Sequence, residues 1–94
     1  MTYKIQFHRK ASKSLQSLNK NDFRRIRKIV NSLESDPRSK GKKLTDSKFP
    51  DVYRVRSGDY RIVYQVKDKE VIVLVLRILD RKDVYRQLKQ AGIL

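Results

Sequence analysis

Three extended segments joined by very short connections dominate the second half of the chain. Residues 52–57 and 60–67 alternate between polar and apolar side chains, whereas residues 71–79 are apolar at nearly every position. Alternation is typical of a strand that buries one face, and a continuous apolar run indicates a strand covered on both faces. The connections at residues 57–59 and 67–70 are too short for a crossover helix, so the three strands are predicted to form an antiparallel meander.

The first half of the chain predicts one strand and two helices. Residues 3–7 alternate in the same way as the later strands, and helical spacing of apolar residues follows from about Arg9 to Leu18. A second helix, capped by Asn21 or Asp22, carries an apolar stripe to Leu33 and is ended by Asp36-Pro37. A short helix from about Asp83 to Gln90 closes the chain.

These elements predict an α+β fold in the order β-α-α-β-β-β-α. The N-terminal strand and the two-helix hairpin are expected to pack on the antiparallel sheet, with residues 1–94 forming one domain. Residues 36–50 form the one long segment without a periodic pattern. We expect Leu44 and Phe49 to anchor this basic segment to the core.

The charge of the chain points to a negatively charged partner. Lysine and arginine total 24 residues against 10 acidic residues, which gives a formal net charge of +14. Such an excess destabilises the compact state by self-repulsion and favours binding to polyanions. Nucleic acid and a strongly acidic protein are the two partners that fit, and both can use the same surface.

Several other classes of protein receive no support from the composition. The chain has no cysteine and only one histidine, so neither a disulfide framework nor a thiolate metal site is predicted, and we expect no metal or other cofactor. No apolar run reaches the roughly 20 residues that a membrane span needs, and no signal-peptide pattern is present. We therefore expect a cytoplasmic protein that does not enter the membrane.

A cluster of arginines is the candidate functional feature. Alternation places Arg54, Arg56 and Arg61 on one face of the first two meander strands, while the register of Arg77 is left open by the apolar run around it. The opposite face carries the core residues Tyr53, Val55, Ile62 and Tyr64. Guanidinium groups match phosphate oxygens in pairs, and Tyr85 is suited to stack on a base. The alternatives are a solvated polar face for the arginines and a core position for Tyr85.

The order of these motifs resembles the RelE/ParE superfamily of bacterial and archaeal toxins, and within it the RelE-type mRNA interferases. The motifs that carry the resemblance are Lys43-Leu44, Pro50-Asp51-Val52-Tyr53-Arg54-Val55-Arg56, Gly58-Asp59-Tyr60-Arg61-Ile62-Val63-Tyr64-Gln65-Val66 and Arg81-Lys82-Asp83-Val84-Tyr85. They span essentially the whole chain.

The resemblance implies a function as the toxin of a type II toxin–antitoxin system. Such a toxin is expected to enter the ribosomal A site and to cut mRNA there without a metal ion, with the 2′-hydroxyl of the RNA as nucleophile. Its partners would be the ribosome, mRNA and a cognate acidic antitoxin that forms a heteromeric complex with it. Two alternatives remain open: a ParE-like inhibitor of DNA gyrase, and a relative that binds RNA or antitoxin with weakened catalysis.

The resemblance also implies roles for individual residues. The catalytic set is Arg54, Arg56, Arg61, Arg81 and Tyr85, and the RNA-binding set is Lys42, Lys43, Arg77, Lys82 and Arg86. Arg54 and Arg56 stand where RelE-type toxins carry two lysines, one of them the proposed general base. Since arginine keeps its proton at ordinary pH, Arg54 is a poor base. Asp80 takes the place of a histidine found in many relatives.

Overall fold

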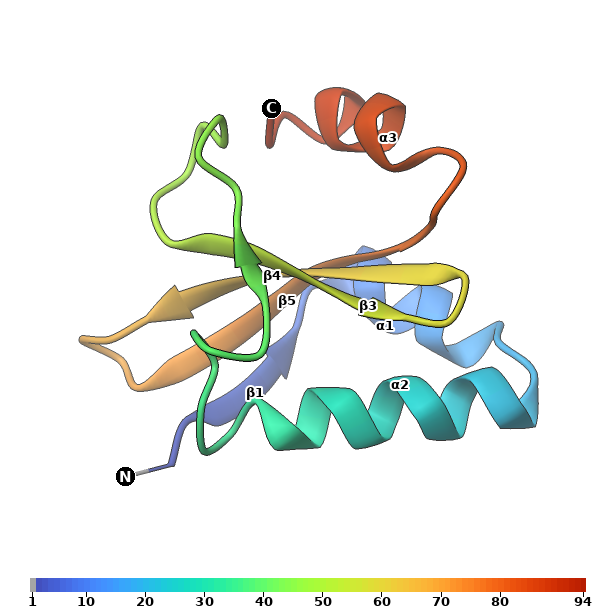
Figure 1. Cartoon of the computed structure of the whole chain (residues 1–94), viewed down its shortest axis with the longest axis horizontal. Helices are drawn as coiled ribbons and strands as arrows, with labels where there is room; N and C mark the ends of the chain where they lie inside the picture. Colours follow the sequence, from blue (N-terminus) through green and yellow to red (C-terminus); the bar gives the residue numbers. More distant parts are fainter. Residues whose placement is uncertain (1) are drawn as a thin grey trace.

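The computed structural model describes residues 2–94 and builds them around a five-stranded sheet in the order β1-β5-β4-β3-β2 (Figure 1). The strands are β1 (Lys4–Phe7), β2 (Lys42–Lys43), β3 (Val52–Ser57), β4 (Tyr60–Lys67) and β5 (Ile72–Asp80). Neighbouring strands from β2 to β5 are antiparallel, which confirms the predicted meander. The N-terminal strand β1 joins the other edge and runs parallel to β5.

Helices cover both faces of this sheet. The helices are α1 (Arg9–Gln16), α2 (Lys20–Ser32) and α3 (Val84–Gln90). Figure 1 shows α2 below the sheet and α3 above it, and α1 packs with α2 against the same core. The predicted α+β order is confirmed, and the two-residue strand β2 is an addition that the sequence pattern did not predict. Within residues 2–94, none of these helices is long and apolar enough to cross a membrane.

The two faces of the sheet have separate apolar cores. The core under α1 and α2 contains Ala11, Leu15, Ile26, Val30, Leu33, Tyr53, Ile62, Tyr64, Val66, Val73, Val75 and Ile78. The core under α3 contains Val52, Val63, Leu76, Leu79, Val84, Leu88 and Ile93. Strand β5 contributes to both, which explains its nearly continuous apolar sequence and confirms the prediction that it is covered on both sides.

A bulge in β5 explains why the alternation is hidden there. Val63 lies opposite Arg77, but the next residue of β4, Tyr64, lies opposite Val75. Leu76 is therefore the extra residue, and it packs into the core beneath α3. This one-residue insertion places Arg77 on the same face as Val63, an orientation that the sequence pattern left open.

Two local expectations were wrong. Asn19, not Asn21 or Asp22, caps α2, because its side-chain oxygen accepts a hydrogen bond from the amide of Asp22 at 2.9 Å. Phe49 is 46% exposed and does not anchor the basic segment. That segment is attached instead by Leu44, which packs on the core beneath α3, and by a 2.7 Å hydrogen bond from the Lys48 amide to the Ile93 carbonyl.

We predict that Leu88→Ala destabilises the protein by about 2–5 kcal/mol. The Leu88 side chain is only 1% exposed, so its removal leaves a cavity between α3 and the sheet. Denaturant unfolding followed by circular dichroism measures the change. The neighbouring exposed residue supplies the control, since Lys89→Ala should stay within about 0.5 kcal/mol of the wild type. Equal stabilities for the two variants would show that α3 contributes little to folding.

Candidate functional site

Three arginines of the candidate site share one face of the sheet, as alternation predicted. Arg56 on β3 lies directly opposite Arg61 on β4, and Arg54 lies two residues along the same strand, opposite the buried Val63. Directly paired residues in an antiparallel sheet project to the same side. The arginines therefore stand beside the core that α3 covers, on the side away from α1 and α2.

A hollow of about 480 Å³ lies over these arginines. Its lining residues are Lys40, Gly41, Lys42, Arg54, Val55, Arg56 and Arg61, and we call it the arginine hollow. It has five cationic side chains and no carboxylate among its lining residues. Their mutual repulsion is relieved when an anion enters, so this hollow is suited to a phosphate group.

A second hollow of about 310 Å³ adjoins the first. Its lining residues are Lys42, Lys43, Leu44, Thr45, Asp46, Arg54 and Tyr85, and we call it the tyrosine hollow. Tyr85 is 65% exposed, which excludes the core position considered for it and leaves its ring free to stack on a planar group. Lys42 and Arg54 line both hollows and form the boundary between them.

The last motif lies at the edge of this surface. The amide of Arg81 donates to the carbonyl of Asp59 at 2.8 Å, and its Nε lies 3.7 Å from the Asp59 carboxylate. These contacts hold Arg81 at the turn between β3 and β4. Arg81 does not line either hollow. The Asp80 carboxylate accepts from the amide of Lys82 at 3.0 Å, a contact that shapes the turn leading into α3.

The two remaining predicted RNA-binding arginines have other contacts. Arg86 on α3 is exposed and lies 3.0 Å from Asp83. Arg77 projects to the arginine face, but its Nη1 lies 3.1 Å from Nδ1 of His8 at the end of β1 and donates to the Leu76 carbonyl. Burial and the nearby Arg77 charge lower the pKa of His8. Arg77 is therefore not brought together with the residues of the hollows.

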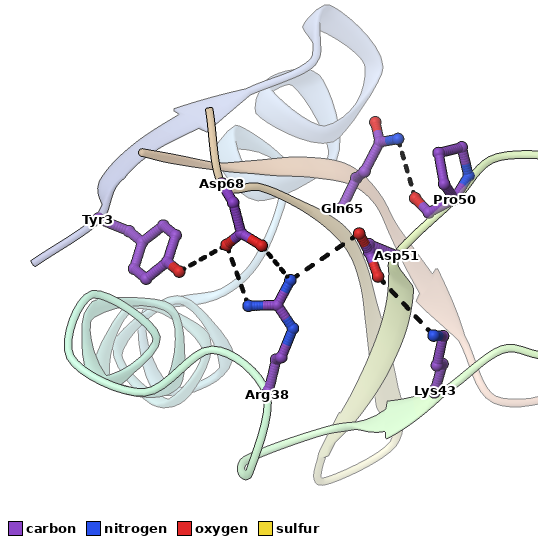
Figure 2. Close-up of polar contacts among 7 residues, drawn as sticks. All are labelled: Tyr3, Arg38, Lys43, Pro50, Asp51, Gln65 and Asp68. Atoms are coloured by element: carbon purple, nitrogen blue, oxygen red, sulfur yellow. Dashed lines mark hydrogen bonds and ion pairs between the residues drawn. The ribbon is translucent and has the colours of Figure 1, made fainter. Parts of the chain in front are cut away.

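Sequence reasoning missed the polar network that holds the basic segment in place, which Figure 2 shows. The two Nη atoms of Arg38 donate to the two oxygens of Asp68 at 3.0 and 2.8 Å, and the Tyr3 hydroxyl donates to the same carboxylate at 2.7 Å. Asp51 lies 3.8 Å from Arg38 and 3.7 Å from Lys43. We call this group the Arg38 network. It ties Arg38 and the strand β2 to the residues just before β1 and β3 and to the β4–β5 turn.

A close backbone approach completes the attachment. The buried Tyr64 hydroxyl donates to the Pro37 carbonyl at 2.6 Å, and burial raises the pKa of Tyr64. A Cβ atom on Gly41 would overlap the same hydroxyl and lie 2.8 Å from the Arg54 carbonyl. Only glycine lets the segment lie this close to β3, and this closeness brings the two lysines on either side of Gly41 to the arginines.

The Arg38 network should also be visible in the pH dependence of stability. Hydrogen bonds from Arg38, and next from Tyr3, hold the pKa of Asp68 below its ordinary value of 3.8. A carboxyl group whose pKa is lowered by folding stabilises the protein above its unfolded pKa, and this contribution is lost as the pH falls through the folded pKa. The difference in Tm between the wild type and Asp68→Asn should be largest near neutral pH and shrink below pH 3.8.

Differential scanning fluorimetry across an acid pH series measures this difference. Glu70→Gln is the matched control, because Glu70 lies in the same turn and makes no ion pair within residues 2–94. A pH-independent difference for Asp68→Asn would mean that the substitution acts through something other than the carboxylate charge.

Metal binding receives no support from the arrangement of side chains. Within residues 2–94, no three histidine, cysteine, aspartate or glutamate side chains come together in a way that could hold a metal ion. The arrangement instead combines a cationic hollow with an adjoining aromatic surface. The protein thus belongs to the class of small α+β proteins with an exposed sheet face suited to a single nucleic-acid strand, whose phosphates and bases match the cationic hollow and the aromatic ring.

Comparisons with known proteins agree with this class. The family model for the ParE toxin of the type II toxin–antitoxin system parDE matches residues 5–85. The mRNA interferase toxin RelE of Escherichia coli (strain K12) is 36% identical over 92 residues, a match that covers 93% of this chain and 94% of the relative. The chain therefore belongs to the RelE/ParE toxin superfamily, as its motifs predicted.

Solved structures confirm the fold. In the archaeal RelE–RelB complex from Pyrococcus horikoshii OT3, the matching chain is 35% identical, with a TM-score of 0.69 over 86% of this chain and 97% of that one. In the intact E. coli RelBE toxin–antitoxin complex, the matching chain is 31% identical, with a TM-score of 0.73 over 83% of this chain and 95% of that one.

Proposed function

We propose that this chain is the toxin of a type II toxin–antitoxin system and an endoribonuclease that cleaves mRNA in the ribosomal A site, which inhibits translation. The observation that carries the proposal is the pair of adjoining hollows, one cationic and one with an exposed tyrosine. A phosphate and a neighbouring base of one RNA strand can occupy them in series. The similarity to the E. coli protein named mRNA interferase toxin RelE supports the same reaction.

The proposed chemistry uses only the RNA, the protein and solvent water. The 2′-oxygen of the RNA attacks the adjacent phosphorus, and the bond from phosphorus to the 5′-oxygen breaks. The products are a 2′,3′-cyclic phosphate and a 5′-hydroxyl end, with one proton leaving the nucleophile and one reaching the leaving oxygen. Charge builds up on the phosphate oxygens in the transition state, where preorganised cations lower the barrier.

The site residues divide between these tasks. Arg56 and Arg61 hold the phosphate, Arg54 contributes charge at the boundary of the hollows, and Tyr85 stacks on a base. Arg81 extends the cationic surface beyond the β3–β4 turn. Lys43, Lys82 and Arg86 bind the flanking RNA backbone, and Lys42 binds the RNA at the boundary of the two hollows. The proposal leaves out Arg77, because its guanidinium faces His8.

The proposed partners follow from the charge and from the relatives. Two of the relatives were solved as complexes of RelE with RelB, one of them described as the intact toxin–antitoxin complex. A cognate antitoxin of this chain should be acidic, because its partner has a formal net charge of +14. We propose a heteromeric complex in the cytoplasm, where the ribosomal target is found, with residues 1–94 acting as one toxin domain.

Mapping of RNA ends on translating ribosomes tests the proposal. Purified protein added to ribosomes that carry a defined mRNA should create new 5′ ends within the A-site codon, while the same mRNA without ribosomes stays intact. In cells, expression of the chain should stop methionine incorporation before DNA synthesis. Arrest of DNA synthesis first would favour a gyrase inhibitor, and ribosome binding without new RNA ends would favour a relative with weakened catalysis.

Arg61→Ala should reduce the single-turnover cleavage rate by roughly 10²-fold, the effect of losing one charge-stabilising donor. Arg61→Lys should recover only part of the rate, because an ammonium cannot reproduce the paired donors of a guanidinium. Arg9→Ala removes the same charge from α1, on the opposite side of the sheet, and should cleave at nearly the wild-type rate. Equal losses in the alanine variants would indicate a general charge effect.

A further inference from the structure

Lys42 occupies a special position in the candidate site. It lies directly opposite Arg54 in the short pairing of β2 with β3, so both side chains project to the arginine face. The two residues are also the shared lining of the arginine hollow and the tyrosine hollow. Any chain that occupies both hollows must pass over this pair.

The covalent structure of RNA determines which part of the nucleotide lies there. The ribose joins the base to the 3′-phosphate and carries the 2′-hydroxyl on the carbon next to the 3′-oxygen. With the base stacked on Tyr85 and the phosphate between Arg56 and Arg61, the ribose must cross the Lys42–Arg54 boundary. The 2′-hydroxyl is then next to these two side chains.

Only one of the two side chains can accept the proton of this hydroxyl. A guanidinium keeps its proton in proteins, whereas the neutral form of an amine is a base. The charged and titratable groups that line the two hollows with Lys42 are Lys40, Lys43, Asp46, Arg54, Arg56, Arg61 and Tyr85. Lys40 lines only the arginine hollow, whereas Lys43 and Asp46 line only the tyrosine hollow, so none of the three lies at the boundary. Lys43 is also drawn to Asp51, 3.7 Å away.

We propose that Lys42 is the general base of the cleavage reaction, an inference that rests on the proposed function. The neutral Nζ of Lys42 takes the proton of the 2′-hydroxyl as the 2′-oxygen bonds to phosphorus. The 5′-oxygen leaves with the bonding electron pair and takes a proton from water. The lysine then returns its extra proton to solvent, so protons and charges balance over the cycle. Arg54 contributes positive charge near the phosphate, next to Lys42, and takes no part in proton transfer.

Lys42→Arg is the decisive variant, because it keeps the positive charge on a side chain of similar length but removes the base. Single-turnover cleavage on saturating ribosomes should fall by about 10²-fold or more, the contribution typical of general base catalysis. Ribosome affinity should stay within about threefold of the wild type, since the counterions released on binding are unchanged. We expect the wild-type cleavage rate to rise with pH, and this rise should be absent in Lys42→Arg.

A double variant separates proton transfer from a structural effect. Lys42→Arg combined with Arg54→Lys exchanges the amine and the guanidinium between the paired positions and leaves the net charge the same. The double variant should cleave at least tenfold faster than Lys42→Arg, and its cleavage rate should again rise with pH. Circular dichroism and Tm should be alike for the wild type and both variants, because all three place exposed or half-buried cations at these positions.

Other results would overturn the assignment. Wild-type cleavage with an unchanged pH profile in Lys42→Arg would show that Lys42 is not the base. Loss of the pH dependence in Asp46→Asn, with Lys42→Arg unaffected, would move that role to the carboxylate of the tyrosine hollow. If the wild-type protein cuts no mRNA on ribosomes, the proposed function fails and the assignment fails with it.

Discussion

Repulsion among like charges is the constraint on which the rest of this structure depends. Five cationic side chains line one hollow without a carboxylate among them, and in isolation they would move apart. Three of them are carried by β3 and β4, whose other residues are held by the two cores. The two lysines belong to a segment with a strand of only two residues, so they need additional attachment.

The Arg38 network supplies this attachment without weakening the cationic hollow. Its two cations, Arg38 and Lys43, are matched by the two carboxylates of Asp51 and Asp68, so the network is neutral as a group. The acidic side chains are used on one side of the segment, while the lysines on the other side keep their charge for a ligand. Asp51 adopts a positive φ of 54°, a conformation that aspartate tolerates better than most residues.

Local sequence patterns predicted much of the fold and of the arginine cluster. The alternation that aligns Arg54, Arg56 and Arg61 is a property of each strand, so it can be recognised without knowing the partners. The bulge at Leu76 and the parallel pairing of β1 depend on contacts between distant segments, and no local pattern encodes them. Phe49 was misplaced because hydrophobicity alone does not tell which apolar residue of a loop reaches the core.

The same limit explains what was missed at the candidate site. Arg38 and Lys43 belong to a basic segment that the charge balance assigned to a polyanion, yet both lie close to carboxylates of the same chain. The partner of Arg38, Asp68, is distant in the sequence, so no local pattern indicates this contact. The importance of Lys42 depends on which residues line two hollows at once, a property of the assembled surface. Gly41 gave no signal, because its requirement comes from the Tyr64 hydroxyl and the Arg54 backbone.

The position of Tyr85 on α3 links recognition of a ligand to the integrity of the fold. The same short helix presents this exposed ring on one side and buries Val84 and Leu88 on the other. A protein that displaces α3 from the sheet would move the Tyr85 ring away from the site and, at the same time, expose Val63, Leu76 and Leu79. The inhibited protein would then expose an apolar surface, so a tightly bound inhibitor must cover this surface with apolar side chains of its own.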